Sequence, residues 1–205
     1  MTTKTVADRG AREMEIIRSA YRIMARQGSH RITLVDIAAE AGVSKALLLY
    51  HFGTKDALLH DAMQWALERT EERIRRRLEQ DMSGKAAIRS LVAAVFVDAA
   101  ANRDFYLFYI DLVEHAARVP KFGGLPAMLT NVINGLYTEV IVTGIHDGSF
   151  AISDADLAAR HMRALIEGTF LQWLQTPDWS TTHGRWRDDC CDALFQLLGA
   201  RPDSG

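Results

Sequence analysis

Apolar residues recur every three or four positions along most of the chain, the spacing typical of amphipathic helices. Alternation of the kind typical of strands is scarce. The pattern predicts an all-α protein, with helices over about residues 9–27, 33–41, 44–51, 54–80, 85–101, 103–117, 125–145, 154–175 and 185–198.

Capping sequences and helix breakers set these boundaries. Thr33 and Asp36 have the spacing of a capping box, in which the hydroxyl accepts from free N–H groups of the first turn. Ser153 and Asp156 repeat that spacing before a later helix. We expect the chain to break at Gly28, Ser83, Gly84, Pro120, residues 123–126, Asp147, Gly148 and Pro177.

The segment 33–59 predicts two short helices joined by a tight turn. Gly42 can adopt the left-handed backbone conformation that such a turn requires. Ala38 and Ala39 are small enough for the two helices to approach closely, and Ser44 can cap the second helix. We therefore expect a helix-turn-helix.

The second short helix carries hydrogen-bond donors that a core helix would lack. They are Lys45, Tyr50 and His51, and Lys55 follows at the start of the next helix. A single helix fits the major groove of duplex DNA, which is flanked by phosphates on both sides. The donors therefore predict a contact with double-stranded DNA.

The charge distribution agrees with a DNA-binding N-terminal end. Residues 1–60 carry nine Lys or Arg and six Asp or Glu, a net charge of +3, and residues 61–205 carry fifteen and twenty, a net charge of −5. The two cysteines are adjacent, at Cys190 and Cys191, so a reducing cytoplasm is expected. The most apolar run, 91–101, is short and contains Asp98, which predicts a core helix and no membrane span.

The run from Ala41 to Lys45 and the run from Tyr50 to Leu58 resemble the signature of the TetR family of transcriptional regulators. The resemblance covers about residues 10–60. It implies a three-helix DNA-binding domain over 1–60 and a helical-bundle ligand-binding and dimerisation domain over 61–205. It further implies a repressor released from a palindromic operator by a small-molecule effector, although activation stays open.

The resemblance also implies roles for single positions, with phosphate contacts at Thr33 and Ser44, base-edge positions at Lys45, Ala46 and Leu47, and backbone contacts at Tyr50, His51 and Lys55. Family members often have glycine where Ala46 stands, a polar residue at Leu47 and tyrosine at Leu49. Leu47 can contact only a thymine methyl group. DNA shape is therefore expected to contribute to sequence recognition.

The second half is rich in aromatic residues, which build either a helical-bundle core or a small-molecule pocket inside it. The candidate pocket residues are Trp65, Phe96, Phe108, Tyr109, Asp111, Glu114, His115, Asn134, Tyr137 and Trp173. Tyr106, Tyr109, Trp65 and Trp173, near Asp111 or Glu114, suit a cationic ligand. An acyl or aromatic ligand fits the same residues.

The last two helices are predicted to associate with their copies in a homodimer. Their candidate interface residues are Leu157, His161, Leu165, Gly168, Phe170, Leu171 and Leu174, and Trp186, Cys190, Leu194, Leu197 and Leu198. Cys190 and Cys191 are interpreted as two small core residues, with a redox switch as the alternative.

Two other classes of protein compete with the regulator. A helical enzyme is one, but the sequence contains neither a phosphate-binding glycine motif nor HExxH, CxxC or Glu-x-x-His. We therefore expect no catalytic residues, no metal site and no cofactor. A dimeric adaptor without DNA affinity is the other alternative.

Overall fold

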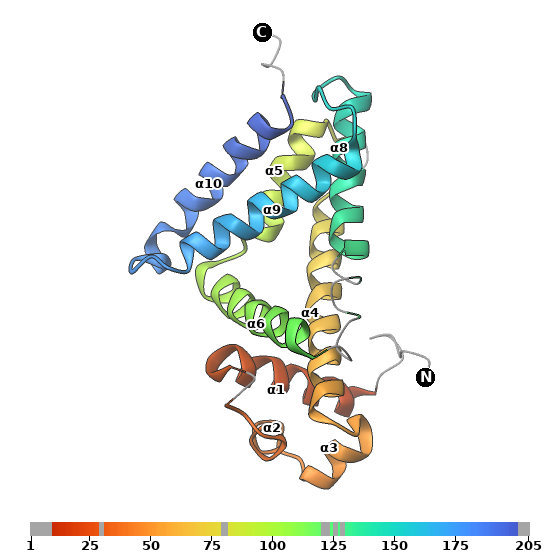
Figure 1. Cartoon of the computed structure of the whole chain (residues 1–205), viewed down its shortest axis with the longest axis vertical. Coiled ribbons are helices and arrows are strands. Elements are labelled where there is room, and N and C mark those ends of the chain that lie inside the picture. Colours follow the sequence, from red (N-terminus) through yellow and green to blue (C-terminus); the bar gives the residue numbers. More distant parts are fainter. Residues whose placement is uncertain are drawn as a thin grey trace. The chain divides into compact units, whose positions relative to one another are not determined.

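The computed structural model describes residues 10–28, 31–78, 82–119 and 130–200, together with Gly124 and Ala127. These residues form helices and loops without a strand, as the hydrophobic pattern predicts (Figure 1). The elements are α1 (Ala11–Gln27), α2 (Leu34–Glu40), α3 (Lys45–Phe52), α4 (Lys55–Arg77), α5 (Gly84–Val95), α6 (Ala99–Arg118), a π-helical turn η3 (Thr130–Asn134), α8 (Gly135–His146), α9 (Ala155–Trp173) and α10 (Trp179–Leu197).

The chain divides into two compact units. The first comprises Met1–Glu68 and Asp104–Pro126, and the second comprises Arg69–Arg103 and Ala127–Gly205. Both α4 and α6 therefore contribute residues to each unit. The division of roles at residue 60 stays a prediction.

The first unit is built on the apolar face of α1. Ile16, Ile17 and Ala20 are fully buried along it, and α2 packs on α1 while α3 packs on α2. Tyr21, also on α1, makes edge contacts with the rings of Trp65 and Phe108. A hydrophobic face of this kind is what turns a helix-forming sequence into a stable domain.

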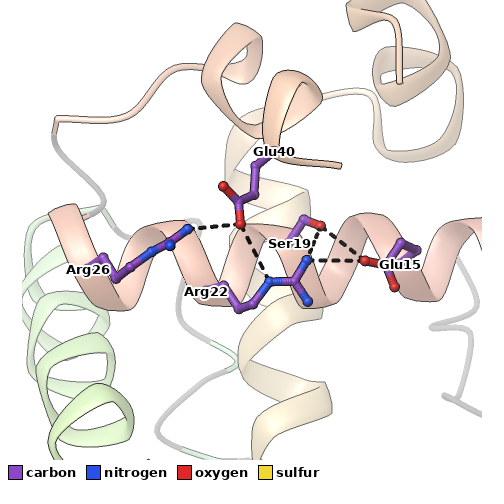
Figure 2. A network of polar contacts seen from close by, with 5 residues as sticks. All are labelled: Glu15, Ser19, Arg22, Arg26 and Glu40. Atoms are coloured by element: carbon purple, nitrogen blue, oxygen red, sulfur yellow. Dashed lines mark hydrogen bonds and ion pairs between the residues drawn. The ribbon is translucent and has the colours of Figure 1, made fainter. Parts of the chain in front are cut away.

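Polar contacts also attach α2 to α1. Figure 2 shows Glu40, the last residue of α2, accepting from two arginines of α1: its Oε1 lies 2.8 Å from Arg26 Nη2 and 3.5 Å from Arg22 Nε. Arg22 Nη2 also donates to Ser19 Oγ at 2.8 Å and to Glu15 Oε1 at 3.1 Å. The buried Ser19 hydroxyl thus has a partner, which is what burial of a polar group requires.

The second unit is a bundle of α5, α8, α9 and α10. Both α5 and α9 pack against α8 and α10 (Figure 1), and the apolar faces of these helices form the core. Its large buried side chains include Ile88, Leu91, Leu136, Ile141, Phe150, Met162, Ile166, Phe170, Trp173 and Leu194.

Four of the predicted dimer residues belong to this core. Phe170, Cys190, Leu194 and Leu198 are at most 2% exposed within the single chain, so they cannot form an outer face. Their apolar character serves the packing of α9 and α10 inside the protomer.

The helix predicted over 85–101 is interrupted at residues 96–98. The α5 helix ends at Val95, and α6 begins at Ala99. Asn102, which is 4% exposed, holds the break: its Nδ2 donates to Val95 O at 2.9 Å, and its Oδ1 accepts from Val97 N at 3.0 Å. A buried amide thereby replaces the missing helical hydrogen bonds across residues 96–98.

Other helix boundaries also differ from the predictions. Asp154, and not Ser153, caps α9 by accepting from Leu157 N at 2.9 Å. The α10 helix begins at Trp179, six residues before the predicted start at 185. The predicted helix 125–145 contains the π-helical turn η3, and most of 120–129 lies outside the described residues.

Within the described ranges, the helices are too short or too polar to cross a membrane.

Candidate nucleic-acid interface

The helix-turn-helix begins with a complete capping box at α2. Thr33 Oγ1 accepts from Val35 N at 3.2 Å and from Asp36 N at 3.3 Å, and Asp36 Oδ2 accepts from Thr33 N at 2.7 Å. The hydrogen bonds from the Thr33 backbone and side chain lower the pKa of Asp36 below its ordinary value. The predicted cap is confirmed, and it fixes where α2 starts.

The turn between α2 and α3 depends on Gly42. Its φ is +62°, in the left-handed region, and the following amide, Val43 N, donates to Ala38 O at 2.9 Å. Ser44 then caps α3, since its Oγ accepts from Leu47 N at 3.1 Å. The conformation predicted for both residues is confirmed.

The α3 helix has one buried and one exposed side. Leu48 and Phe52, four residues apart, face the core at 0% and 8% exposure. Lys45, Ala46 and Tyr50 are exposed, and Tyr50 is 83% exposed. A large aromatic side chain held in water on a capped helix is available to a partner, and a helix with its side chains matches the width of the major groove.

Two further candidates for DNA contact on α3 are apolar: Leu47 at a base-edge position and Leu49 at a backbone-contact position. Leu49 is 38% exposed, and Leu47 is half-buried. Neither side chain offers a hydrogen-bond donor, so polar recognition of DNA by α3 is limited to its other residues, such as Lys45 and Tyr50.

Two of the predicted phosphate donors also hold the domain together. Lys55 Nζ donates to Ile32 O at 2.7 Å, which attaches the start of α4 to the residue before the α2 cap. His51 is half-buried, and its Nδ1 lies 3.1 Å from Glu13 Oε1 on α1. Arg12, next to Glu13, donates to Gly42 O at 3.2 Å. Sequence reasoning missed these contacts because the partners lie 23 to 38 residues apart.

The two capping hydroxyls differ in how their protons are used. Thr33 Oγ1 donates to Asp36 Oδ2 at 2.8 Å, so its proton is already engaged. Ser44 Oγ acts as an acceptor for Leu47 N. A hydroxyl that accepts one bond can still donate to a phosphate, so Ser44 fits the predicted contact without losing its cap.

Six of the ten pocket candidates belong to the first unit: Trp65, Phe108, Tyr109, Asp111, Glu114 and His115. Trp65 and Phe108 contact Tyr21, and His115 Nε2 lies 3.5 Å from Asp56 Oδ1. Asp111 and Glu114 line a surface hollow of about 450 Å³ against the end of α1.

The other four candidates, Phe96, Asn134, Tyr137 and Trp173, belong to the second unit. Phe96 stacks on Phe170 with ring centroids 4.2 Å apart, and Trp173 Nε1 donates to Trp179 O at 2.8 Å. Both side chains fill the core of the bundle.

His183 joins this aromatic cluster. Its ring contacts Phe96 and Trp173, and its Nε2 lies 2.9 Å from Asn102 Oδ1. Burial lowers the pKa of His183 below its ordinary value, which favours the uncharged ring.

Two buried carbonyl oxygens lack a hydrogen-bond partner within the described part of the chain. They are Asn134 Oδ1, at the end of η3, and Gln64 Oε1 on α4. Asn134 was predicted as a polar pocket residue, and Gln64 was missed because nothing in the helical pattern separates it from an ordinary surface glutamine.

The described residues contain no cluster of three or more His, Cys, Asp or Glu that could hold a metal ion. Cys190 is buried, and burial raises the pKa of its thiol to about 11. A thiol that resists ionisation is a poor nucleophile, which favours the interpretation of Cys190 as a core residue.

A capped two-helix unit with an exposed second helix, joined to an apolar helical bundle, defines the class of helix-turn-helix regulators. Residues 16–62 match the model of bacterial regulatory proteins of the tetR family, and residues 84–199 match that of the C-terminal part of BetI-type transcriptional repressors. The chain therefore belongs to the TetR family of bacterial transcriptional regulators.

Individual relatives support the same assignment. The chain is 26% identical to the transcriptional repressor KstR2 of Rhodococcus jostii (strain RHA1) over 156 residues, 76% of each chain. It is 27% identical to the regulator TtgR of Pseudomonas putida, over 95% of this chain and 96% of that protein. A transcriptional regulator from Saccharomonospora viridis, solved in complex with choline, is 25% identical with a TM-score of 0.79, over 89% of this chain and 94% of that one.

The predicted function class is thereby confirmed. The chain is a ligand-responsive, DNA-binding transcriptional regulator, and the proteins it resembles are regulators and not enzymes.

Proposed function

We propose that the protein is a homodimeric repressor that places α3 in the major groove of a palindromic operator and leaves it when a small molecule binds. The exposed side of α3, between the Ser44 cap and the buried Phe52, carries this proposal. It presents Lys45 and Tyr50 to solvent while Leu48 anchors the helix to the core.

The contacts follow from these positions. Lys45, Ala46 and Leu47 face base edges, with Leu47 restricted to thymine methyl groups. Leu49 stands where family members often have a tyrosine and offers no hydrogen bond to the DNA backbone. Tyr50, His51, Lys55 and the hydroxyl of Ser44 bind phosphates on either side, whereas the Thr33 hydroxyl can donate to a phosphate only by releasing Asp36. Because few polar groups reach the bases, the shape of the operator contributes to its selection.

The exposed side of α9 supports a dimer. Leu157 and Leu171 are 40% and 44% exposed, and His161, Ala164 and Gly168 lie between them at helical spacing on the same side. A Cβ added at Gly168 would have nothing within 4 Å in the protomer, which leaves room for a second helix. A two-fold dimer then presents two α3 helices about 34 Å apart, one turn of DNA.

The effector we propose to test first is choline, because a similar regulator was solved in complex with it. Tyr106 and Tyr109 on α6, which are 6% and 9% exposed, lie edge to face with centroids 6.0 Å apart, a pair of rings of the kind that attracts quaternary ammonium groups. In the second unit, the buried Asn134 Oδ1 is a separate candidate acceptor for a ligand, at a π-helical turn of the kind often found at functional sites.

Enrichment of duplexes from a randomised library tests the DNA-binding part. We expect an inverted repeat with half-sites about one turn apart, bound with submicromolar affinity at 150 mM salt. Inverting one half-site should abolish tight binding. If the library yielded only random sequences with no shared motif, the proposal would be contradicted.

Titration of the bound duplex with choline tests the effector. Release of the duplex at micromolar to millimolar choline is expected, with potassium chloride at equal ionic strength as the control. If neither choline nor any compound of an acyl and aromatic panel released the enriched duplex, regulation by a small molecule would be contradicted. DNA recognition would be unaffected by that result.

A further inference from the structure

Glu13 of α1 lies outside the helix-turn-helix but contacts one of its phosphate-binding candidates. Its Oε1 is 3.1 Å from Nδ1 of His51, and both side chains are less than a fifth exposed, at 15% and 19%. Their separation of 38 residues along the chain means that the fold, and not local sequence, brings them together.

The pairing fixes which ring nitrogen carries a proton. An ionised carboxylate only accepts hydrogen bonds, so the proton between the two side chains resides on Nδ1 of His51. In a neutral imidazole the other nitrogen, Nε2, then has a lone pair and no proton. It cannot donate to a phosphate oxygen, which is itself an acceptor.

We infer that Glu13 is a positioning residue for DNA binding: it orients His51 so that this side chain donates to a phosphate only as an imidazolium, and operator binding therefore takes up a proton. The inference rests on the proposed function. Proton uptake places one proton on Nε2 of His51, and the positive charge that results lies between the Glu13 carboxylate and the DNA phosphate, both of which stabilise it.

Among the described groups, Glu13 is the charged side chain that contacts the imidazole ring of His51. On α3 the neighbours of His51 are the rings of Tyr50, 5.3 Å away, and Phe52, 6.1 Å away. On α1 the guanidinium of Arg12 donates to Gly42 O, and at the start of α4 the ammonium of Lys55 donates to Ile32 O.

The test is duplex affinity between pH 6 and pH 8.5 at constant ionic strength, measured by fluorescence anisotropy on a labelled duplex enriched from the library. The wild type should bind about tenfold more weakly at pH 8.5 than at pH 6, because a charge-assisted hydrogen bond is lost. In Glu13→Gln the amide can donate to Nδ1, which moves the proton of neutral His51 to Nε2. This variant should hold its affinity at high pH.

Three controls make the result specific to this pair. His51→Gln donates at every pH and should flatten the profile in the same way, whereas Glu13→Asp keeps a carboxylate and should keep the slope. Calorimetry in buffers of different ionisation enthalpy should show up to one proton taken up per wild-type protomer and fewer in Glu13→Gln. If Glu13 had only a structural role, Glu13→Gln would lower duplex affinity equally at all pH values.

A Glu13→Gln profile parallel to the wild type would overturn the inference and leave DNA binding intact. A wild-type protein that binds no duplex at any pH would instead overturn the proposed function, and this inference with it. Thermal melting of each variant at pH 7 checks that the fold survives the substitution.

Discussion

The residues of α3 fall into two groups: buried residues that anchor the helix to the core and exposed residues that are available to contact a partner. Leu48 is fully buried, whereas Tyr50, two positions later, is 83% exposed. Removal of the exposed Tyr50 ring leaves the core packing intact, whereas truncation of the buried Leu48 side chain leaves a cavity. Substitutions on the exposed side therefore report on binding with little effect on folding.

Tyr50→Ala should weaken duplex binding by about 1–3 kcal/mol and change the free energy of unfolding by less than about 0.5 kcal/mol. Anisotropy and urea unfolding measure the two quantities. Val142→Ala, at a side chain 50% exposed on α8, is the matched control and should alter neither. Full duplex affinity in the Tyr50 variant would remove this residue from the interface.

At the scale of residues, the sequence predicts the local features that depend on neighbours along the chain, such as helix caps and turns. The Thr33 and Ser44 caps and the left-handed Gly42 follow from residue type and spacing, and all three are confirmed. The partners of His51 and Lys55 lie on α1 and just before α2, and they are brought close only by the tertiary fold. The spacing of residues along the sequence does not encode these contacts.

At the scale of elements, the start of α5 is packed directly against α8. A Cβ added at Gly84 would lie 2.2 Å from Gly144 Cα, and one added at Gly144 would lie 2.1 Å from the ring of Phe150. Gly84 N also donates to Asp147 Oδ2 at 2.7 Å. Hydrogen bonds from Ser149, first from its side chain, and from the Gly84 backbone lower the pKa of Asp147.

Gly144→Ala should therefore destabilise the protein by about 1–3 kcal/mol, because the new methyl group overlaps a buried ring that has little room to move. Gly135→Ala, at the first residue of α8 with nothing within 4 Å of the added Cβ, is the matched control. It should be neutral or slightly stabilising. Equal melting temperatures for the two variants would show that the helices separate easily.

Helix prediction succeeded where a breaker or a cap stands at the boundary and failed where a tertiary contact sets it. The run 91–101 is apolar enough to continue as one helix, yet Asn102 ends it through hydrogen bonds to Val95 and Val97. At the early start of α10, Trp179 makes an edge contact with Trp173, which the helical pattern does not reveal.

At the scale of the whole molecule, the dimer that we propose would convert weak half-site contacts into operator selection. Two linked heads bind as one, so the second half-site adds affinity without a new kind of contact. The exposed side of α9 is the surface on which this depends in our proposal.

Leu157→Glu with Leu171→Glu should yield a folded monomer in sedimentation velocity, with operator affinity reduced at least about tenfold. Charges on an apolar contact face oppose association because they must be desolvated. Val142→Glu with Ile145→Glu, two exposed apolar residues on α8, is the matched control and should stay dimeric. A dimeric α9 variant would place the interface elsewhere.

The contact between Gly84, Gly144 and Phe150 constrains how this lineage can diverge. A larger residue at position 144 becomes tolerable only after the side chain at position 150 shrinks, and the shrunken side chain alone opens a cavity. Each single step therefore destabilises the protein, so positions 144 and 150 are expected to change together, whereas Gly84 is expected to stay glycine because a Cβ there would meet the backbone of Gly144.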